Sequence, residues 1–258
     1  MRNEKLALPS GLSPALSQAG ESGPQTLLIH GWTCRKSDWH PTMTALQDDF
    51  RLTAIDLPGH GESHQQSVDP WTIKNLADVV IEAVQAMSEP DITLVGHSMG
   101  GVVALEAARQ LDSVRSVVLV DTFVIPYGDL TEDQAQKTAQ PFYDDFPGAI
   151  AGLVDNFTGS GAGEPDKDRL KAEMSAGDPT RMLPLWSDLL RWTPGAAFAE
   201  IKAPIHAING DLVPEAARAR CSNHVTEHRL EGAGHFPQVE MPERFHQSLR
   251  EVLKMVDF

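Results

Sequence analysis

The stretch "DITLVGHSMGGVVALEAARQL", residues 91–111, decides the fold. It passes from an apolar, strand-like run into a helical pattern through a tight corner of small and polar residues. Within it, "GHSMG" at 96–100 has the spacing Gly-x-Ser-x-Gly after a predicted strand and before a predicted helix, the context of a nucleophile elbow. The flanking glycines let two backbone segments approach a strained serine, so its hydroxyl projects outward. Ser98 is therefore the candidate nucleophile, and a simple helix cap is the alternative interpretation.

Short apolar runs alternate with helical patterns along the rest of the chain. This alternation predicts an α/β fold with a mostly parallel, doubly wound sheet and crossover helices. The predicted strands are residues 26–29, 52–56, 92–95, 116–121, 204–209 and 227–230. Asp69 and Pro70 are expected to cap and open one helix, and Pro242 to open another. Ligands of such sheets bind beyond the carboxyl ends of the strands, which is where we look for chemistry.

Residues 126–195 lack strand candidates and are helical in pattern, acidic and rich in aromatic residues. A structureless loop of this length is improbable in a compact domain, so a helical cap insertion is expected over the carboxyl edge of the sheet. The predicted organisation is a core of residues 1–125 and 196–258 with a cap of residues 126–195. An apolar pocket is expected beneath the cap, with His30, Phe123, Tyr127 and Trp186 as candidate lining residues.

A serine hydroxyl needs a base within hydrogen-bond reach and a third group that orients the base. His235, in "EGAGHFPQVEMPERF" after the last predicted strand, is the histidine placed for this role. Two aspartates compete to orient it. Asp211 lies in "NGDLVP" after the strand 204–209, and Asp121 ends the strand one earlier. We favour Asp211 and keep Asp121 as the alternative acid.

Four separated segments carry a family resemblance: "LLIHGW" at 27–32, "DLPGHGES" at 56–63, "GHSMGG" at 96–101 and "GAGHFP" at 232–237. Together they resemble the α/β-hydrolase fold family, of the compact type with a helical cap. The resemblance implies that the backbone N–H groups of Trp32 and Met99 form an oxyanion hole. The chain departs from the family at the acid, because Asp211 follows Gly210 directly. Some relatives place the acid after the earlier strand, which keeps Asp121 open.

The leading functional hypothesis is a serine esterase or lactonase that cleaves a small, largely apolar ester through an acyl-enzyme at Ser98. Halide- and epoxide-cleaving members of the family carry aspartate at the position of Ser98, so those reactions fit poorly. The alternatives are a carbon–carbon bond hydrolase, a perhydrolase, a cofactor-free dioxygenase that pairs its histidine with an acid placed like Asp121, and a non-catalytic small-molecule receptor.

Charge and composition bound the partners. The formal charge of −15 over 258 residues and a pI near 5.0 disfavour nucleic acid and acidic membranes as partners. The chain has two distant cysteines and a polar segment at residues 1–24, which predict a cytoplasmic protein. It has no run of about 20 apolar residues, so no membrane span is expected. No motif for a metal, nucleotide or organic cofactor is found, so we expect a small-molecule substrate and no cofactor.

Overall fold

The computed structural model describes residues 1–87, 91–159 and 161–255. These residues form an α/β-hydrolase fold with one eight-stranded sheet in the order β1-β2-β4-β3-β5-β6-β7-β8. Only the first two strands are antiparallel to their neighbours. The strands are β1 (Arg2–Lys5), β2 (Ala15–Ala19), β3 (Gln25–Ile29), β4 (Arg51–Ile55), β5 (Ile92–His97), β6 (Val114–Val120), β7 (Ile205–Asn209) and β8 (Val225–Arg229). The mostly parallel sheet expected from the sequence is confirmed, whereas β1 and β2 were not predicted.

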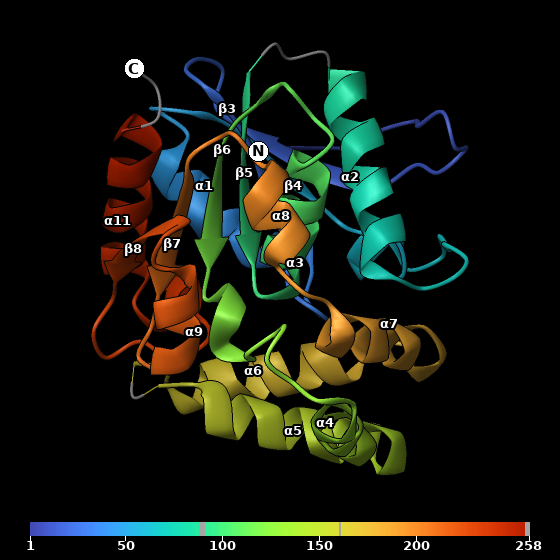
Figure 1. Cartoon of the computed structure of the whole chain (residues 1–258). Helices are drawn as coiled ribbons and strands as arrows, with labels where there is room; N and C mark the ends of the chain where they lie inside the picture. The colour runs from blue at the N-terminus through green and yellow to red at the C-terminus, as the bar shows by residue number, and fades with distance from the viewer. Residues whose placement is uncertain (88–90, 160, 256–258) are drawn as a thin grey trace.

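Helices cover both faces of the sheet because buried side chains alternate along its strands. In β3, Leu27 and Ile29 face the cluster that contains α2 and α3, and Leu28 faces the cluster that contains α1 and α11. Figure 1 shows α2 and α11 on opposite sides of the sheet. The core helices are α1 (His40–Leu46), α2 (Ile73–Met87), α3 (Met99–Ala108), α8 (Gly195–Glu200), α9 (Glu215–Cys221), α10 (Pro237–Glu240) and α11 (Pro242–Met255). The fold is therefore doubly wound.

One predicted helix start is wrong. Asp69 and Pro70 lie before α2, and the helix begins at Ile73. The Thr72 hydroxyl accepts a hydrogen bond from the Asn75 N–H at 3.2 Å, as an N-terminal cap does. The cap therefore lies two residues beyond the proline.

Four helices between β6 and β7 are called the cap helices here: α4 (Glu132–Asp144), α5 (Phe146–Phe157), α6 (Glu164–Ser175) and α7 (Pro179–Arg191). Two of these helices begin at an aspartate cap: Asp145 and Asp178 accept hydrogen bonds from N–H groups in the first turns of α5 and α7. Figure 1 shows the cap helices beyond the arrowheads of the parallel strands. The domain boundaries at residues 126 and 195 stay a prediction.

None of the helices in the described ranges combines the length and apolar character that crossing a bilayer requires.

Candidate active site

The turn between β5 and α3 holds Ser98 in a strained conformation, with φ 52° and ψ −120°. Space for it depends on two glycines. A Cβ at Gly96 would lie 2.2 Å from the Gly100 carbonyl oxygen, and one at Gly100 would lie 2.4 Å from the carbonyl oxygen of Ile29. Because these contacts are with backbone, any larger residue would displace the turn. The structure thus has the elbow geometry that the spacing predicts.

Ser98, His235 and Asp121 form a continuous hydrogen-bonded row. The Ser98 Oγ lies 3.1 Å from His235 Nε2, and His235 Nδ1 lies 2.7 Å from Asp121 Oδ2. Asp121 is fully buried, and its carboxylate accepts the Nδ1–H of the imidazole. His235 Nε2 is therefore free to accept the serine proton, as a general base must.

The preference for Asp211 as the orienting acid does not agree with this geometry. The Asp211 carboxylate points outward, where it accepts the Gly232 N–H at 2.7 Å and pairs with Arg229 at 3.1 Å. Its side chain is 43% exposed. The physical reason is local, because the Asp211 N–H donates to the Ala233 carbonyl at 2.8 Å and the carboxylate is held on the surface by Gly232 and Arg229. The alternative, Asp121, occupies the acid position.

The second oxygen of Asp121 is also fixed. Its Oδ1 accepts the Gly210 N–H at 2.9 Å. The Arg218 Nη2 donates to the Gly210 carbonyl at 2.6 Å, and the Arg218 guanidinium pairs with Glu227. A Cβ at Gly210 would lie 2.4 Å from the Ala233 carbonyl oxygen. The loop after β7 therefore contributes an amide that orients the acid.

Two buried side chains hold the loop that carries His235. His97 Nε2 lies 2.7 Å from the His235 carbonyl oxygen, so this nitrogen carries the proton and donates it. Burial lowers the pKa of His97 to about 3 and keeps the ring neutral. The Glu240 carboxylate accepts N–H groups from Gly159, Gly234 and Phe236 at 2.8, 2.6 and 2.9 Å. Glu240 could not be identified from the sequence, because its partners lie up to 81 residues away.

The turn after β3 passes directly against the nucleophile. A Cβ at Gly31 would lie 3.4 Å from the Ser98 Cβ. Trp32 follows it, and Met99 is the first residue of α3, so the Met99 N–H has no acceptor within its own helix. The Met99 side chain is fully buried, and it does not line the cavity beside Ser98 within the described chain. Any contribution of these two residues to an oxyanion hole therefore comes from the backbone.

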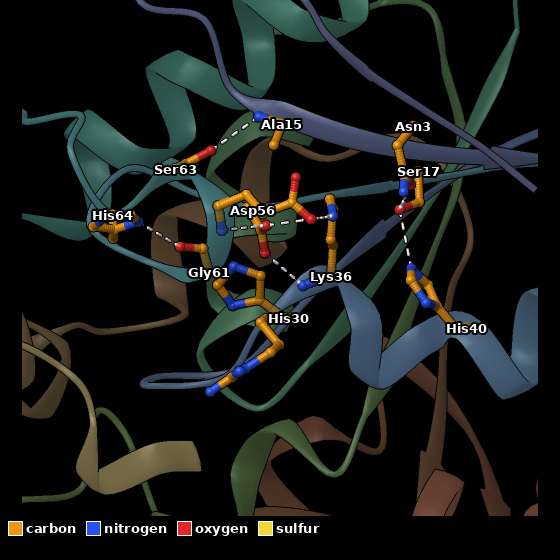
Figure 2. A network of polar contacts seen from close by, with 12 residues as sticks. Asn3, Ala15, Ser17, His30, Lys36, His40, Asp56, Gly61, Ser63 and His64 are labelled. Carbon is orange, nitrogen blue, oxygen red and sulfur yellow. Dashed lines mark hydrogen bonds and ion pairs between the residues drawn. The ribbon is translucent and has the colours of Figure 1, made fainter.

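Asp56 anchors the far end of that turn, as Figure 2 shows. Its Oδ1 accepts the Lys36 N–H at 2.6 Å and its Oδ2 accepts the Glu62 N–H at 2.9 Å. The Lys36 ammonium lies 3.8 Å from Oδ2 with a side chain only 3% exposed. Burial raises the pKa of the Asp56 carboxyl, and the two N–H groups and Lys36 oppose that shift. The "DLPGHGES" segment thus braces the loop that follows Trp32.

His30 braces the same loop and is not a pocket residue. Its Nδ1–H donates to the Gly31 carbonyl at 2.8 Å, and its Nε2 accepts the Leu57 N–H at 3.1 Å. Burial lowers the pKa of His30 to about 4. Phe123 also lies outside the cavity, where the Arg220 guanidinium sits 5.5 Å above its ring. Both expectations for the pocket are therefore corrected.

A cavity of about 30 Å³ adjoins Ser98. Tyr127 and Trp186 line it, as expected from the sequence, together with other apolar residues of the core and the cap helices: Trp32, Leu153, Phe157 and Met174. Trp32 stacks on Trp186 with ring centroids 4.6 Å apart, and its indole N–H donates to the Met182 carbonyl at 3.0 Å. The loop beside the nucleophile is thereby tied to α7. A cavity of this size admits one or two water molecules.

Comparison with known proteins agrees with this geometry. Residues 26–247 match the model of the alpha/beta hydrolase family. The chain belongs to this family. It is 31% identical over 249 residues to a pimeloyl-[acyl-carrier protein] methyl ester esterase of Methylococcus capsulatus, covering 90% of this chain and 95% of the relative.

Solved structures show the same fold. A thermophilic esterase from Thermogutta terrifontis has a TM-score of 0.84 and 24% identity, with all of both chains covered. A bromoperoxidase from Bacillus anthracis has a TM-score of 0.87 and 18% identity over 98% of this chain and all of the other. At these identities the likeness shows the fold alone.

Proposed function

We propose that this alpha/beta hydrolase is a serine hydrolase of small, largely apolar carboxylic esters or lactones, acting through an acyl-enzyme at Ser98. The observation that carries the proposal is the row Ser98–His235–Asp121, with contacts of 3.1 and 2.7 Å. The esterase name of the Methylococcus capsulatus relative supports ester hydrolysis. The small volume of the cavity beside Ser98 supports a substrate whose acyl group is short.

The proposed reaction has two halves. Ser98 Oγ attacks the acyl carbon while its proton passes to His235 Nε2, and the N–H groups of Trp32 and Met99 stabilise the oxyanion. Collapse breaks the ester bond, and His235 returns the proton to the departing alcohol. Water then attacks the acyl group on Ser98 while His235 accepts its proton. The bond between Oγ and the acyl carbon breaks, His235 returns the proton to Ser98 Oγ, and the carboxylic acid is released. The Asp121 carboxylate stabilises the imidazolium in both halves.

The test uses p-nitrophenyl esters graded from acetyl to octanoyl with wild type, Ser98→Ala and a control, Ser222→Ala, at an exposed serine. We expect the short esters to be cleaved fastest and Ser98→Ala to lose at least about a thousandfold in kcat. A fluorophosphonate should label Ser98 in the wild type and in the control Ser222→Ala, and it should not label Ser98→Ala. Unchanged turnover in Ser98→Ala would exclude this serine as the nucleophile. Absence of labelling in folded wild type would favour a receptor.

A cofactor-free dioxygenase is the second candidate, because the acid beside His235 comes from the end of β6. The sequence resemblance connects that placement, and a tryptophan near position 32, with these enzymes. Oxygen consumption with heteroaromatic substrates, measured with an oxygen electrode, is the discriminating assay. Consumption that persists in Ser98→Ala would favour the dioxygenase, and its absence would exclude it.

A further inference from the structure

Two side chains that line the cavity beside Ser98 carry a buried polar atom without a partner. In the described chain, neither the Tyr127 hydroxyl nor the Trp186 indole N–H makes a hydrogen bond. Tyr127 is fully buried and Trp186 is 4% exposed. Buried tyrosine and tryptophan usually find a partner, and a buried donor left unpaired costs about 1–3 kcal/mol. Neither atom has a partner among the described residues that would offset this cost.

Other indoles of the site and its surroundings are satisfied, which singles out Trp186. Trp32 Nε1 donates to the Met182 carbonyl at 3.0 Å, and Trp192 Nε1 donates to the Glu106 carboxylate at 2.7 Å. Trp39 Nε1 also lacks a partner among the described residues, but Trp39 does not line this cavity. Among the described residues, Tyr127 and Trp186 are therefore the two that both line the cavity and carry an unpaired buried polar atom.

The chemistry of the two groups defines what they would recognise. An indole N–H only donates, so its partner must be an acceptor, and a tyrosine hydroxyl can donate to the same kind of atom. Burial raises the pKa of Tyr127, so its hydroxyl stays neutral. Within the described residues no lysine or arginine lines the cavity. A carboxylate would lack a counter-charge there, so the acceptor is an uncharged oxygen.

We propose that Tyr127 Oη and Trp186 Nε1 select uncharged esters that carry a second acceptor oxygen, an ether, carbonyl or hydroxyl oxygen, within a few bonds of the cleaved ester. The inference rests on the proposed function and deepens it from any small ester to an oxygen-bearing one. The apolar wall accepts the carbon atoms, and these two donors recognise the additional oxygen.

The test compares substrates of equal size that differ by one oxygen. The acyl pair is p-nitrophenyl methoxyacetate and p-nitrophenyl butyrate, and the alcohol pair is 2-methoxyethyl butyrate and butyl butyrate. The ratio of kcat/KM within each pair is measured for wild type, Tyr127→Phe and Trp186→Phe. The matched controls are Tyr143→Phe, at an exposed tyrosine of α4, and Trp39→Phe, at an unpaired indole that does not line the cavity.

We expect the ratio in at least one pair to fall about three- to tenfold in each of the two cavity variants and to stay at the wild-type value in both controls. Loss of stacking on Trp32 affects both members of a pair, so the ratio isolates the hydrogen bond. Thermal unfolding adds a substrate-free measurement: Tyr127→Phe should be at least as stable as wild type, because an unpaired buried hydroxyl is removed.

The inference is overturned if the kcat/KM ratios of both substrate pairs are unchanged in both cavity variants. If one cavity variant fails to fold, unchanged ratios in the other are sufficient to overturn it. That outcome is distinct from failure of the proposed function. If only this inference fails, wild type cleaves both esters of a pair and a fluorophosphonate labels Ser98. If the proposed function fails, wild type cleaves neither ester and Ser98 is not labelled.

Discussion

Replacing Asp121 by asparagine tests the assignment of the acid with the least change in shape. In wild type, Oδ1 of Asp121 accepts the Gly210 N–H at 2.9 Å and Oδ2 accepts the His235 Nδ1–H at 2.7 Å. An asparagine has one oxygen and one NH₂ group, and the Gly210 amide requires the oxygen on its side. The NH₂ group must then face His235 Nδ1, which forces the proton onto Nε2.

An Nε2–H imidazole cannot accept the proton of Ser98. We therefore expect Asp121→Asn to lose about 10³- to 10⁴-fold in kcat, or about 4–5.5 kcal/mol of transition-state stabilisation, with KM for a short p-nitrophenyl ester little changed. The thermal unfolding temperature should stay close to wild type, because shape and the Gly210 hydrogen bond are retained.

Asp211→Asn is the matched control. Asp211 lies on the surface, and an asparagine there can still accept the Gly232 N–H. The lost pair with Arg229 is exposed, so we expect kcat within about threefold of wild type. The reasoning is refuted if Asp211→Asn loses a hundredfold or more while Asp121→Asn remains active.

Three further predictions concern the supports of the site. Arg218→Gln should lower kcat at least about tenfold with little change in KM, because the Gly210 amide that orients the acid loses its brace; a folded variant with wild-type kcat contradicts this. Trp32→Phe removes the bond to the Met182 carbonyl and should lower the free energy of unfolding by about 1–2 kcal/mol in urea titrations, whereas an unchanged midpoint and slope would show that the bond contributes nothing. His60, whose pKa burial lowers to about 3, cannot take up a proton in the folded state near pH 5 although the unfolded chain can, so stability falls as pH drops below about 6.5. His60→Gln should remove about 2 kcal/mol of the wild-type loss between pH 7 and 5, and parallel stability curves would disprove this.

The elbow could be predicted from the sequence because its cause is local. Gly96 and Gly100 are required by backbone contacts within a few residues of Ser98 or from the adjacent strand, and that requirement is visible as a spacing. The position of His235 follows from the same logic, since its loop comes directly after the last strand. These features depend on short-range backbone geometry, which a pattern records.

The acid could not be assigned in the same way. Asp121 and Asp211 both follow neighbouring parallel strands, and nothing local distinguishes them. What separates them is tertiary: Asp121 adopts a left-handed conformation with φ 48° and its carboxylate meets His235, while the Asp211 carboxylate lies on the surface beside Arg229. The antiparallel strand β2 was missed for a different reason, because its residues, Ala15–Ala19, mix apolar and polar side chains and lack the short apolar run by which strands were predicted.

The stacked pair of Trp32 and Trp186 spans the boundary between the sheet's loop and a cap helix, with rings 4.6 Å apart and inclined by 20°. Two indoles so close couple electronically, and that coupling disappears when they separate. The stacked pair therefore gives an intrinsic spectroscopic signal of the contact between α7 and the loop after β3. Near-ultraviolet circular dichroism and tryptophan emission, followed by stopped flow as an ester is mixed in, should change if α7 separates from the loop and stay constant if the contact is kept.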